Sequence, residues 1–276
     1  MTSNRISVQN LHFGYDKETP VLKGINLNFN DSATAIIGEN GSGKTTFVKL
    51  LKGLLKPVSG SIYLKGQNTA GITVAKLARY IGLVFQNPND QIFKSTVLDE
   101  VLFGPLNIGQ TMDQAKFNAE KALDLVGLSR FKQIHPYDLG LSDRKLVCIA
   151  AILAMDTEII IFDEPTIAQD YCGKERIKQI IKTLRSQGKL VITITHDLDF
   201  VGETFDRIIV FHDGQVLLDD HPRAVFQDQA LLKNAHLELP SITQLGRRLG
   251  FKDTLLTIDE LIEQIKYKTW YNETNS

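Results

Sequence analysis

Residues 33–46, ATAIIGENGSGKTT, join an apolar strand pattern to a glycine-rich loop of the form Gly-x-x-x-x-Gly-Lys-Thr. Glycines lack a Cβ, so successive backbone N–H groups can close around phosphate oxygens, and the positive end of the following helix points at the same anion. In this pattern the lysine reaches the β- and γ-phosphates and the threonine hydroxyl holds Mg²⁺. We therefore expect a nucleoside triphosphate to be bound by Gly38, Asn40, Gly41, Ser42, Gly43, Lys44, Thr45 and Thr46.

A second group of chemical residues follows two apolar strand patterns. Residues 159–165, IIIFDEP, end in two acids, which would lie at the carboxyl edge of a parallel sheet, where ligands bind. There Asp163 could hold Mg²⁺ through water and Glu164 could polarise an attacking water; the alternative is that the acids only favour the start of the next helix. His196 follows the strand pattern 190–195 and could donate to the γ-phosphate, although a single histidine is usually structural.

Composition narrows the class of protein. The chain has 276 residues, 43% of them hydrophobic, and a net charge of −1, so it has no basic field for nucleic acid or anionic lipid. The longest apolar run, 146–155, is about half of what a bilayer crossing needs. The two cysteines, Cys148 and Cys172, have no metal-ligand spacing and favour a reducing cytosol. We expect a soluble cytosolic protein that can still dock on a membrane partner.

The elements that would position these residues follow from periodicity. Alternating segments predict antiparallel strands at 5–11, 21–29 and 61–64, and a denser apolar run predicts a buried strand at 80–85. A helix between the strands 159–163 and 190–195 predicts a parallel, buried sheet, and Asp213-Gly214 joins a closing hairpin. Helical periodicity is found over residues 87–156. The phosphate loop leads into a helix whose buried face is predicted to consist of Phe47, Leu50, Leu51 and Leu54.

After about residue 235 the pattern is helical again. Thr257 to Glu260 form a capping box, followed by an apolar helix face with Ile258, Leu261, Ile262 and Ile265. This tail predicts a small helical appendage. Packing against the main domain and a surface for a partner are equally good interpretations of that face.

Together these pieces resemble the nucleotide-binding subunit of ABC transporters over about residues 5–235. The resemblance implies that residues 38–46 are the Walker A loop, Asp163 the Walker B acid, Glu164 the catalytic base and His196 the switch histidine. It implies ATP and Mg²⁺ as cofactors, with Lys44, Glu164 and His196 in the catalytic group and Thr45, Gln86 and Asp163 around the metal.

Three further positions match less closely. Gln86 is similar to the glutamine that touches Mg²⁺ and the transport partner. Tyr15 lies where an aromatic residue stacks on adenine, with an ordinary sheet tyrosine as the alternative. Asp170 matches the acid of the D-loop, although Gln169 replaces the usual leucine.

The resemblance implies an α/β fold: a P-loop NTPase with an ABC-type antiparallel β subdomain, an inserted helical subdomain at about 87–157 and a small C-terminal helical extension. The ATP-binding domain would cover 1–235 and the extension 236–276. The segments 86–93, QNPNDQIF, and 99–105, DEVLFGP, are similar to the ATPases of energy-coupling-factor transporters, which drive vitamin and transition-metal uptake in prokaryotes.

That similarity implies an ATP-hydrolysing subunit, peripheral on the cytoplasmic face of the cell membrane. Its expected partners are a transmembrane coupling subunit and a substrate-binding membrane subunit, and no nucleic acid. Two alternatives remain: a soluble ABC-type ATPase outside transport, and a regulatory subunit that binds ATP but hydrolyses it weakly.

One motif departs from the family. The signature Leu-Ser-Gly-Gly-Gln, which faces the ATP of the partner subunit, is replaced by Leu139-Gly140-Leu141-Ser142-Asp143 in an ungapped alignment; a gapped one starts the motif at Leu141. In both, the backbone approaches a phosphate less freely, and Asp143 near a helix start would repel the γ-phosphate. We therefore predict a heterodimer, in which a second ATPase subunit brings an intact signature opposite Lys44.

Overall fold

The computed structural model describes residues 5–16, 18–30 and 33–274, with the backbone alone for 268–274. Its larger sheet has the order β10-β9-β3-β8-β7-β6. The strands are β3 (Ala33–Gly38), β6 (Ile81–Val84), β7 (Ile159–Asp163), β8 (Leu190–Ile194), β9 (Arg207–His212) and β10 (Gln215–Asp220). Neighbours pair in parallel except β10, which closes the predicted hairpin with β9. Strands β3, β7 and β8 are buried throughout, as expected of a sheet covered on both faces.

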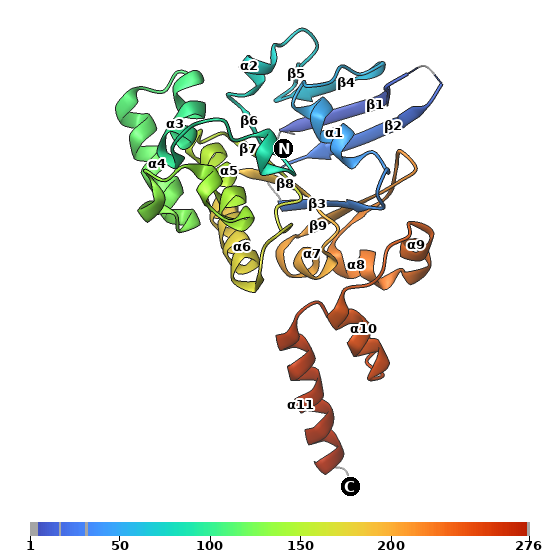
Figure 1. Cartoon of the computed structure of the whole chain (residues 1–276). Helices are drawn as coiled ribbons and strands as arrows, with labels where there is room; N and C mark the ends of the chain where they lie inside the picture. Colours follow the sequence, from blue (N-terminus) through green and yellow to red (C-terminus); the bar gives the residue numbers. More distant parts are fainter. Residues whose placement is uncertain (1–4, 17, 31–32, 275–276) are drawn as a thin grey trace.

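A smaller antiparallel sheet, in the order β2-β1-β4-β5, packs over the first (Figure 1). It contains β1 (Ile6–Gly14), β2 (Pro20–Phe29), β4 (Ser59–Leu64) and β5 (Gln67–Asn68). Helix α1 (Lys44–Leu51) shares one hydrophobic core with both sheets. The Phe47 ring lies 6.3 Å from that of Phe29 in β2 and 5.4 Å from that of Phe211 in β9, measured between centroids. The start of α1 is thereby held at the sheet edge.

The predicted buried face of α1 is wrong at its last residue. The helix ends at Leu51, the chain turns at Gly53 with φ +75°, and Leu54 is 43% exposed. The Leu54 amide then donates to the Lys49 carbonyl, which closes the helix end.

The helical region lies between β6 and β7, at the left of Figure 1. It contains α3 (Val97–Asn107), α4 (Met112–Val126) and α5 (Leu141–Ala154), with short 3-10 turns at Pro88–Asp90, Ser129–Phe131 and Pro136–Asp138; α2 (Val74–Leu77) precedes β6. The apolar residues Ala119, Ala122, Leu123 and Val126 form a buried face of α4. Helices α6 (Tyr171–Ser186) and α7 (Leu198–Thr204) pack in the core on the other face of the sheet from α1.

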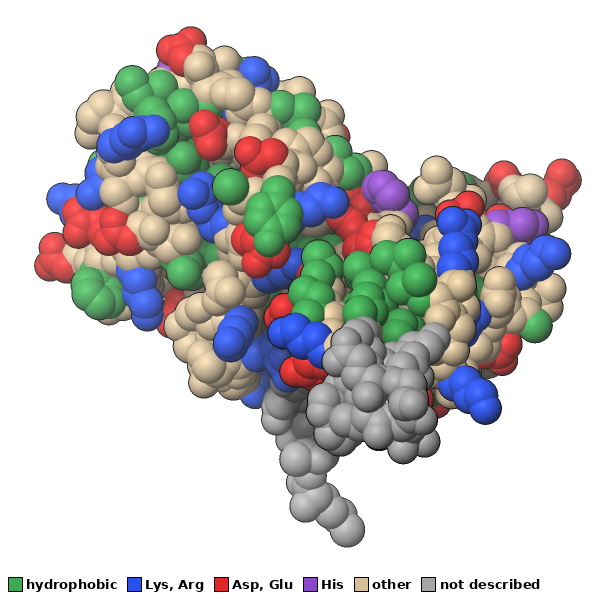
Figure 2. All heavy atoms as spheres, turned by 90° about the horizontal axis from the view of Figure 1, so that it is seen from below, with side chains coloured by type: hydrophobic (Ala, Val, Ile, Leu, Met, Phe, Trp, Pro, Cys, Tyr) green, Lys and Arg blue, Asp and Glu red, His purple; other side chains and the backbone are tan. Residues whose placement is uncertain are grey.

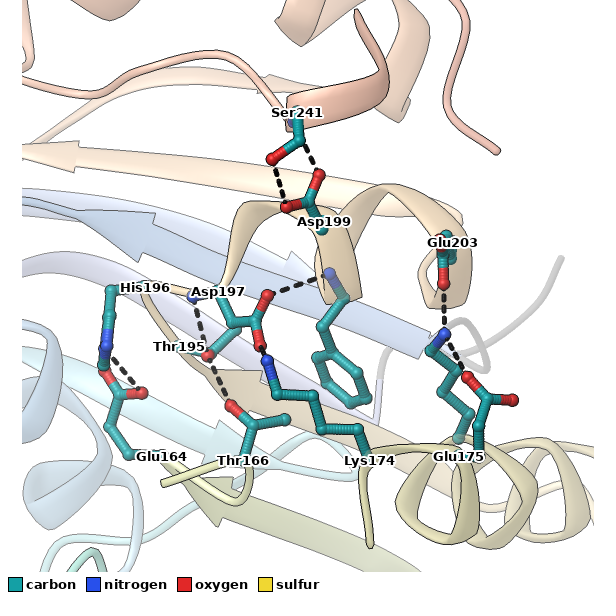
Figure 3. Close-up of polar contacts among 12 residues, drawn as sticks. Glu164, Thr166, Lys174, Glu175, Thr195, His196, Asp197, Asp199, Glu203 and Ser241 are labelled. Atoms are coloured by element: carbon teal, nitrogen blue, oxygen red, sulfur yellow. Dashed lines mark hydrogen bonds and ion pairs between the residues drawn. The ribbon is translucent and has the colours of Figure 1, made fainter. Parts of the chain in front are cut away.

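The C-terminal part contains α8 (Pro222–Gln227), α9 (Gln229–Asn234), α10 (Ser241–Arg248) and α11 (Ile258–Thr274), and the last two project away from the body (Figure 1). Its attachment is partly polar: the Ser241 amide and hydroxyl donate to the two oxygens of Asp199, at 2.6 and 2.8 Å (Figure 3). Leu239 and Leu256 extend the main core into it. No helix in the described part of the chain is long and apolar enough to span a membrane.

The extension packs partly against the main domain, whereas a partner on its exposed apolar face stays a prediction. The Glu260 amide donates to the Thr257 hydroxyl, as a capping box requires, and the Glu260 carboxylate accepts from the amides of Leu256 and Thr257. Leu261 is buried. Seen from below, hydrophobic side chains gather in one patch on this face of the molecule (Figure 2). Among the described side chains of α10, its C-cap and α11, the exposed hydrophobic ones are Leu245, Leu249, Ile258, Ile262, Ile265 and Tyr267.

Candidate functional site

The glycine-rich loop joins β3 to α1 and needs its glycines at defined points. Gly38, Gly41 and Gly43 have φ values of +152°, +86° and +99°. A Cβ on Gly38 would lie 2.2 Å from the Phe211 carbonyl oxygen, and one on Gly43 would lie 2.6 Å from Leu22. At Gly41 a Cβ would meet nothing within 4 Å, so that position needs glycine for its backbone angle alone.

Lys44, the first residue of α1, folds its side chain back over this loop. Its Nζ donates to the carbonyl oxygens of Gly38 at 2.7 Å and Glu39 at 2.8 Å. Burial lowers the pKa of the Lys44 ammonium, while the carboxylates of Glu164, Asp163 and Glu39 oppose that shift. A cation held so close to backbone N–H groups is suited to bind a terminal phosphate.

A cavity of about 340 Å³ opens above the loop. It unites residues from several distant segments, and the sequence predicted most of them: Tyr15, Val21, Asn40, Gly41, Gly43, Lys44, Thr45, Thr46, Gln86, Glu164 and Ile194. Gly38, Ser42 and Asp163 are buried and do not line it. Tyr15 is 64% exposed, packs edge to face on Phe13, and has its hydroxyl 3.3 Å from that of Thr46. Its ring is therefore available at the mouth of the cavity.

Asp163 ends β7 beside this cavity. Its carboxylate receives a hydrogen bond from the Thr45 side chain, while its Oδ1 atom is buried with no hydrogen-bond partner among the described residues. Burial, and then the neighbouring Glu164, raise the pKa of Asp163; Lys145, Thr45 and Lys49 oppose the rise. Because Mg²⁺ prefers oxygen ligands, an unpartnered carboxylate oxygen beside a threonine hydroxyl fits that ion.

Glu164 and His196 face each other across the ends of β7 and β8. His196 Nδ1 lies 3.0 Å from Glu164 Oε2 (Figure 3). The Glu164 side chain is nearly buried, whereas that of His196 is exposed. Glu164 has φ +48°, an uncommon backbone angle for a residue with a side chain, and its amide donates to the Ile194 carbonyl. The strand ends thus direct an acid toward the cavity and a histidine toward solvent.

Behind His196 lies a polar network that the sequence analysis missed. The Asp197 amide donates to the Thr195 hydroxyl, and the Asp197 carboxylate caps α7 by accepting from the Phe200 amide (Figure 3). The same carboxylate pairs with Lys174 of α6 at 2.5 Å. These bonds hold the segment that carries His196.

Lys145 is a second residue that the sequence analysis missed. It is 1% exposed in α5, and its Nζ donates to the carbonyl oxygens of Phe85 (2.7 Å), Gln86 (2.9 Å) and Asp163 (3.0 Å). It thereby joins the Gln86 segment to the end of β7. The signal was present in the sequence, because Lys145 precedes Ile149 by four residues and therefore lies on the buried helix face.

The divergent signature segment forms the start of α5. Gly140 is the N-cap and has no side-chain hydrogen bond to offer, Leu141 is 46% exposed, and Asp143 lies in the first turn. Asp170 caps α6 by accepting from the Gly173 amide at 2.7 Å. The structure therefore places Asp143 near a helix start, as predicted.

A separate apolar cavity of about 300 Å³ lies between the Gln86 segment and the helical region. Phe93 and Phe103, both exposed, meet edge to face at its rim, 4.6 Å between centroids. Gln91 supports this wall: it accepts from the Phe85 amide and donates to the Cys148 carbonyl.

Comparisons with known proteins agree with this geometry. The family model described as ABC transporter matches residues 22–167. The energy-coupling factor transporter ATP-binding protein EcfA of Methanocaldococcus jannaschii is 36% identical over 91% of this chain and 91% of its own length. EcfA1 of Caldanaerobacter subterraneus is 38% identical over 94% of this chain and 98% of its own length.

Solved structures give the same result. The structure of cbiO1 from Clostridium perfringens, described as part of the ABC transporter complex cbiONQ, has a TM-score of 0.75 at 32% identity and covers 89% of this chain and 99% of its own. The bacterial ABC transporter cassette MJ0796, solved as a dimer bound to ADP and Pi after hydrolysis, has a TM-score of 0.72 at 29% identity over 79% of this chain and 99% of its own. This chain belongs to the ABC transporter family of ATPases and has the ATP-binding cassette fold of that family.

Proposed function

We propose that this chain is the ATP-hydrolysing subunit of an energy-coupling-factor importer for a vitamin or a transition metal, peripheral on the cytoplasmic face of the membrane. The observation that carries the proposal is the apolar cavity next to the segment 86–93, with Phe93 and Phe103 in contact at its rim. It occurs in a chain whose relatives include EcfA proteins. Gln86, which follows the apolar-cavity residue Phe85 in the chain, lines the cavity above the phosphate loop. A membrane partner held at one cavity could thus respond to nucleotide in the other.

In the proposed reaction this chain binds Mg²⁺-ATP over residues 38–46. Lys44 would neutralise phosphate charge, and Thr45, Gln86 and Asp163 would hold the Mg²⁺. Glu164 orients a water for in-line attack on the γ-phosphate, and His196 stabilises the charge that develops there. The 3.0 Å contact between His196 and Glu164 supports this pairing.

The proposed assembly is a heterodimer of ATPase subunits. At the start of α5 the exposed Leu141 and the acid Asp143 replace groups that would face the ATP of the partner subunit. An acid near a helix N-terminus satisfies the helix dipole and disfavours an incoming phosphate. A second subunit with an intact signature would complete the site over Lys44.

The membrane partners would be a transmembrane coupling subunit and a substrate-binding subunit. An apolar pocket with two aromatic residues at its rim suits a short amphipathic helix of such a coupling subunit. The lining of this cavity is mainly apolar, with the single acid Glu100, whose carboxylate already accepts from the amides of Phe93 and Lys94.

The test is native mass spectrometry of the tagged chain, extracted from its own cells in mild detergent. We expect a complex with a different ATPase chain and small membrane proteins, and we expect F103S to release the membrane proteins without loss of nucleotide binding. V58S is the matched control, because Val58 is an exposed apolar residue just before β4 that lines neither of the two cavities. Self-dimers alone, or ribosomal or DNA-bound partners, would overturn the transport proposal.

A further inference from the structure

Glu39, His212 and His236 form a cluster outside the nucleotide cavity. The two carboxylate oxygens of Glu39 lie 3.0 Å from His212 Nδ1 and 2.7 Å from His236 Nδ1. One nitrogen or oxygen from each residue lies within 4.8 Å of those from the other two. The imidazole rings are 5.9 Å apart between centroids. None of the three residues lines the cavity above the phosphate loop.

The fold brings two of these residues together through strand register. Gly38 of β3 pairs with Phe211 of β9 in parallel, so the next residues, Glu39 and His212, leave the sheet side by side. His212 ends its strand there, and Glu39 begins the phosphate loop.

The third residue comes from the connection after α9, drawn in orange in Figure 1. The buried Leu232 and Ala235 anchor this helix end in the main core. His236 follows with φ +54°, a backbone angle that disfavours residues with side chains, and turns its ring onto Glu39. A surface histidine held in this way by core anchors and an unfavourable angle is a built feature.

Two imidazole nitrogens and one carboxylate oxygen are a ligand set for borderline divalent transition metals such as Zn²⁺, Co²⁺ and Ni²⁺; Mg²⁺ and Ca²⁺ prefer oxygen. A second observation points to a ligand here. The His212 Nδ1 atom is buried, and among the described residues it has no hydrogen bond of acceptable geometry, despite its distance to Glu39. A metal ion would give that nitrogen a partner. His236 is 70% exposed at its side chain, so water could occupy a fourth position.

We propose that Glu39, His212 and His236 bind a divalent transition-metal ion of the zinc type, which joins the connection after α9 to the phosphate loop. The Glu39 carbonyl oxygen accepts a hydrogen bond from Lys44 Nζ. The residue whose side chain would bind the metal therefore also contacts the phosphate-binding lysine through its backbone. Glu39 belongs to the phosphate loop, but its side chain, like those of His212 and His236, does not line the nucleotide cavity, and the proposed site stands independently of the proposed transport function.

The test uses Co²⁺ as a spectroscopic probe and Zn²⁺ as its competitor, with the full chain free of nucleotide and excess Mg²⁺ present. We expect one Co²⁺ per chain with visible absorption typical of imidazole ligation, displaced by Zn²⁺. H236Q should weaken binding at least about tenfold, and E39Q should do the same. H12Q is the control, because His12 lies on β1, outside the cluster, and its ring Nε2 contacts Asn10 Oδ1.

Melting temperatures distinguish a loss of metal binding from a loss of folding. Zn²⁺ should raise the melting temperature of the wild type and of H12Q but not that of H236Q, since a ligand that binds only the folded state stabilises it. His236 is exposed, so its substitution should leave the metal-free melting temperature nearly unchanged. Equal Co²⁺ binding by H236Q and the wild type, or no binding by the wild type, would overturn the proposal and leave the cluster as a hydrogen-bonded contact.

Discussion

Ser142 and Gln169 hold each other through two hydrogen bonds. The Ser142 hydroxyl donates to Gln169 Oε1 at 3.0 Å, and Gln169 Nε2 donates to the Ser142 carbonyl oxygen at 3.2 Å. Ser142 belongs to the divergent signature segment, and Gln169 stands where the family's D-loop has a leucine. The two departures therefore lie in contact, and a glycine at 173 leaves room for them, because a Cβ there would lie 2.3 Å from Gln169 Oε1.

We expect this pair to be energetically coupled. In a double-mutant cycle with S142A and Q169L, the stability effects should be non-additive by about 0.5–1.5 kcal/mol, the net value of one hydrogen bond. The free energies of unfolding come from urea titrations of the four proteins. The Ser142 carbonyl remains in every variant, so the cycle reports the hydroxyl bond alone. Strict additivity would contradict the coupling.

Glu164 is expected to act on the attacking water. E164Q keeps the side-chain shape but cannot accept a proton, so hydrolysis should fall about 10²–10⁴-fold while ATP affinity stays within a few-fold of the wild type. Turnover is measured in the assembled complex, and affinity by titration with a fluorescent ATP analogue. E158Q is the matched control, because Glu158 precedes the same strand and pairs on the surface with Lys65. Undiminished turnover in E164Q would remove Glu164 from this role.

Much of the site was predictable because its residues follow strand ends. The loop 38–46, the acids at the end of β7 and the histidine after β8 meet at one sheet edge, which is a consequence of parallel strands and short loops. The α/β class and the two sheets followed from strand periodicity and the strand–helix–strand unit. The prediction that Leu54 is buried was wrong, because Gly53, a usual helix-ending residue, turns the chain before Leu54 although the apolar spacing continues.

The contacts that escaped prediction join elements far apart in the sequence. Lys145 lies 60 residues from the Phe85 carbonyl it binds, and His236 lies 197 from Glu39. Such pairs depend on the register of strands and on how helices pack, which local periodicity does not specify. The Lys145 position could have been inferred as buried, but its three carbonyl partners could not.

Asp163 should lower the stability of the nucleotide-free protein at neutral pH. Its pKa is raised above the ordinary 3.8, so the folded protein holds the proton more tightly than the unfolded chain does. The free energy of unfolding therefore falls as the pH rises from 3.8 through the raised pKa of Asp163. At neutral pH the whole of this loss in the free energy of unfolding is present. D163N should be more stable at pH 7.5 by about 1 kcal/mol, a usual size for one stabilising change, with a smaller gain near pH 4.

The measurement is thermal or urea unfolding of D163N and the wild type at both pH values, without nucleotide or Mg²⁺. D163N should also lose Mg²⁺-dependent ATP binding, because the amide is a poorer ligand for the ion than a carboxylate. A variant less stable than the wild type at pH 7.5 would show that Lys145 and Thr45 outweigh the cost of burial.

Tyr15 is expected to stack on the adenine ring. Y15A should weaken ATP binding about fivefold to tenfold, equivalent to roughly 1–1.4 kcal/mol of aromatic contact, whereas Y15F should bind nearly as well as the wild type. Y15F also removes the hydroxyl that lies 3.3 Å from that of Thr46, so it separates the ring from the polar contact. Equal losses in both variants would place the effect on the hydroxyl.

Lys145 should leave a signature in the pH dependence of stability. Burial lowers the pKa of Lys145 to about 8 from 10.5, so between these values the unfolded chain binds a proton that the folded protein has lost. Stability contributed by this residue should therefore rise with pH from about 8 to 10.5, by at most about 1.4 kcal/mol per pH unit, and K145M should remove that rise. Lys52 serves as the control, because burial also lowers its pKa to about 8. K52M should remove only the part of the rise in stability that Lys52 contributes. Urea unfolding at pH 8 and pH 10 measures the change in the free energy of unfolding with pH for each variant. If this change is the same in K145M and in the wild type, the Lys145 ammonium stays charged in the folded protein, held by the carbonyl oxygens of Phe85, Gln86 and Asp163.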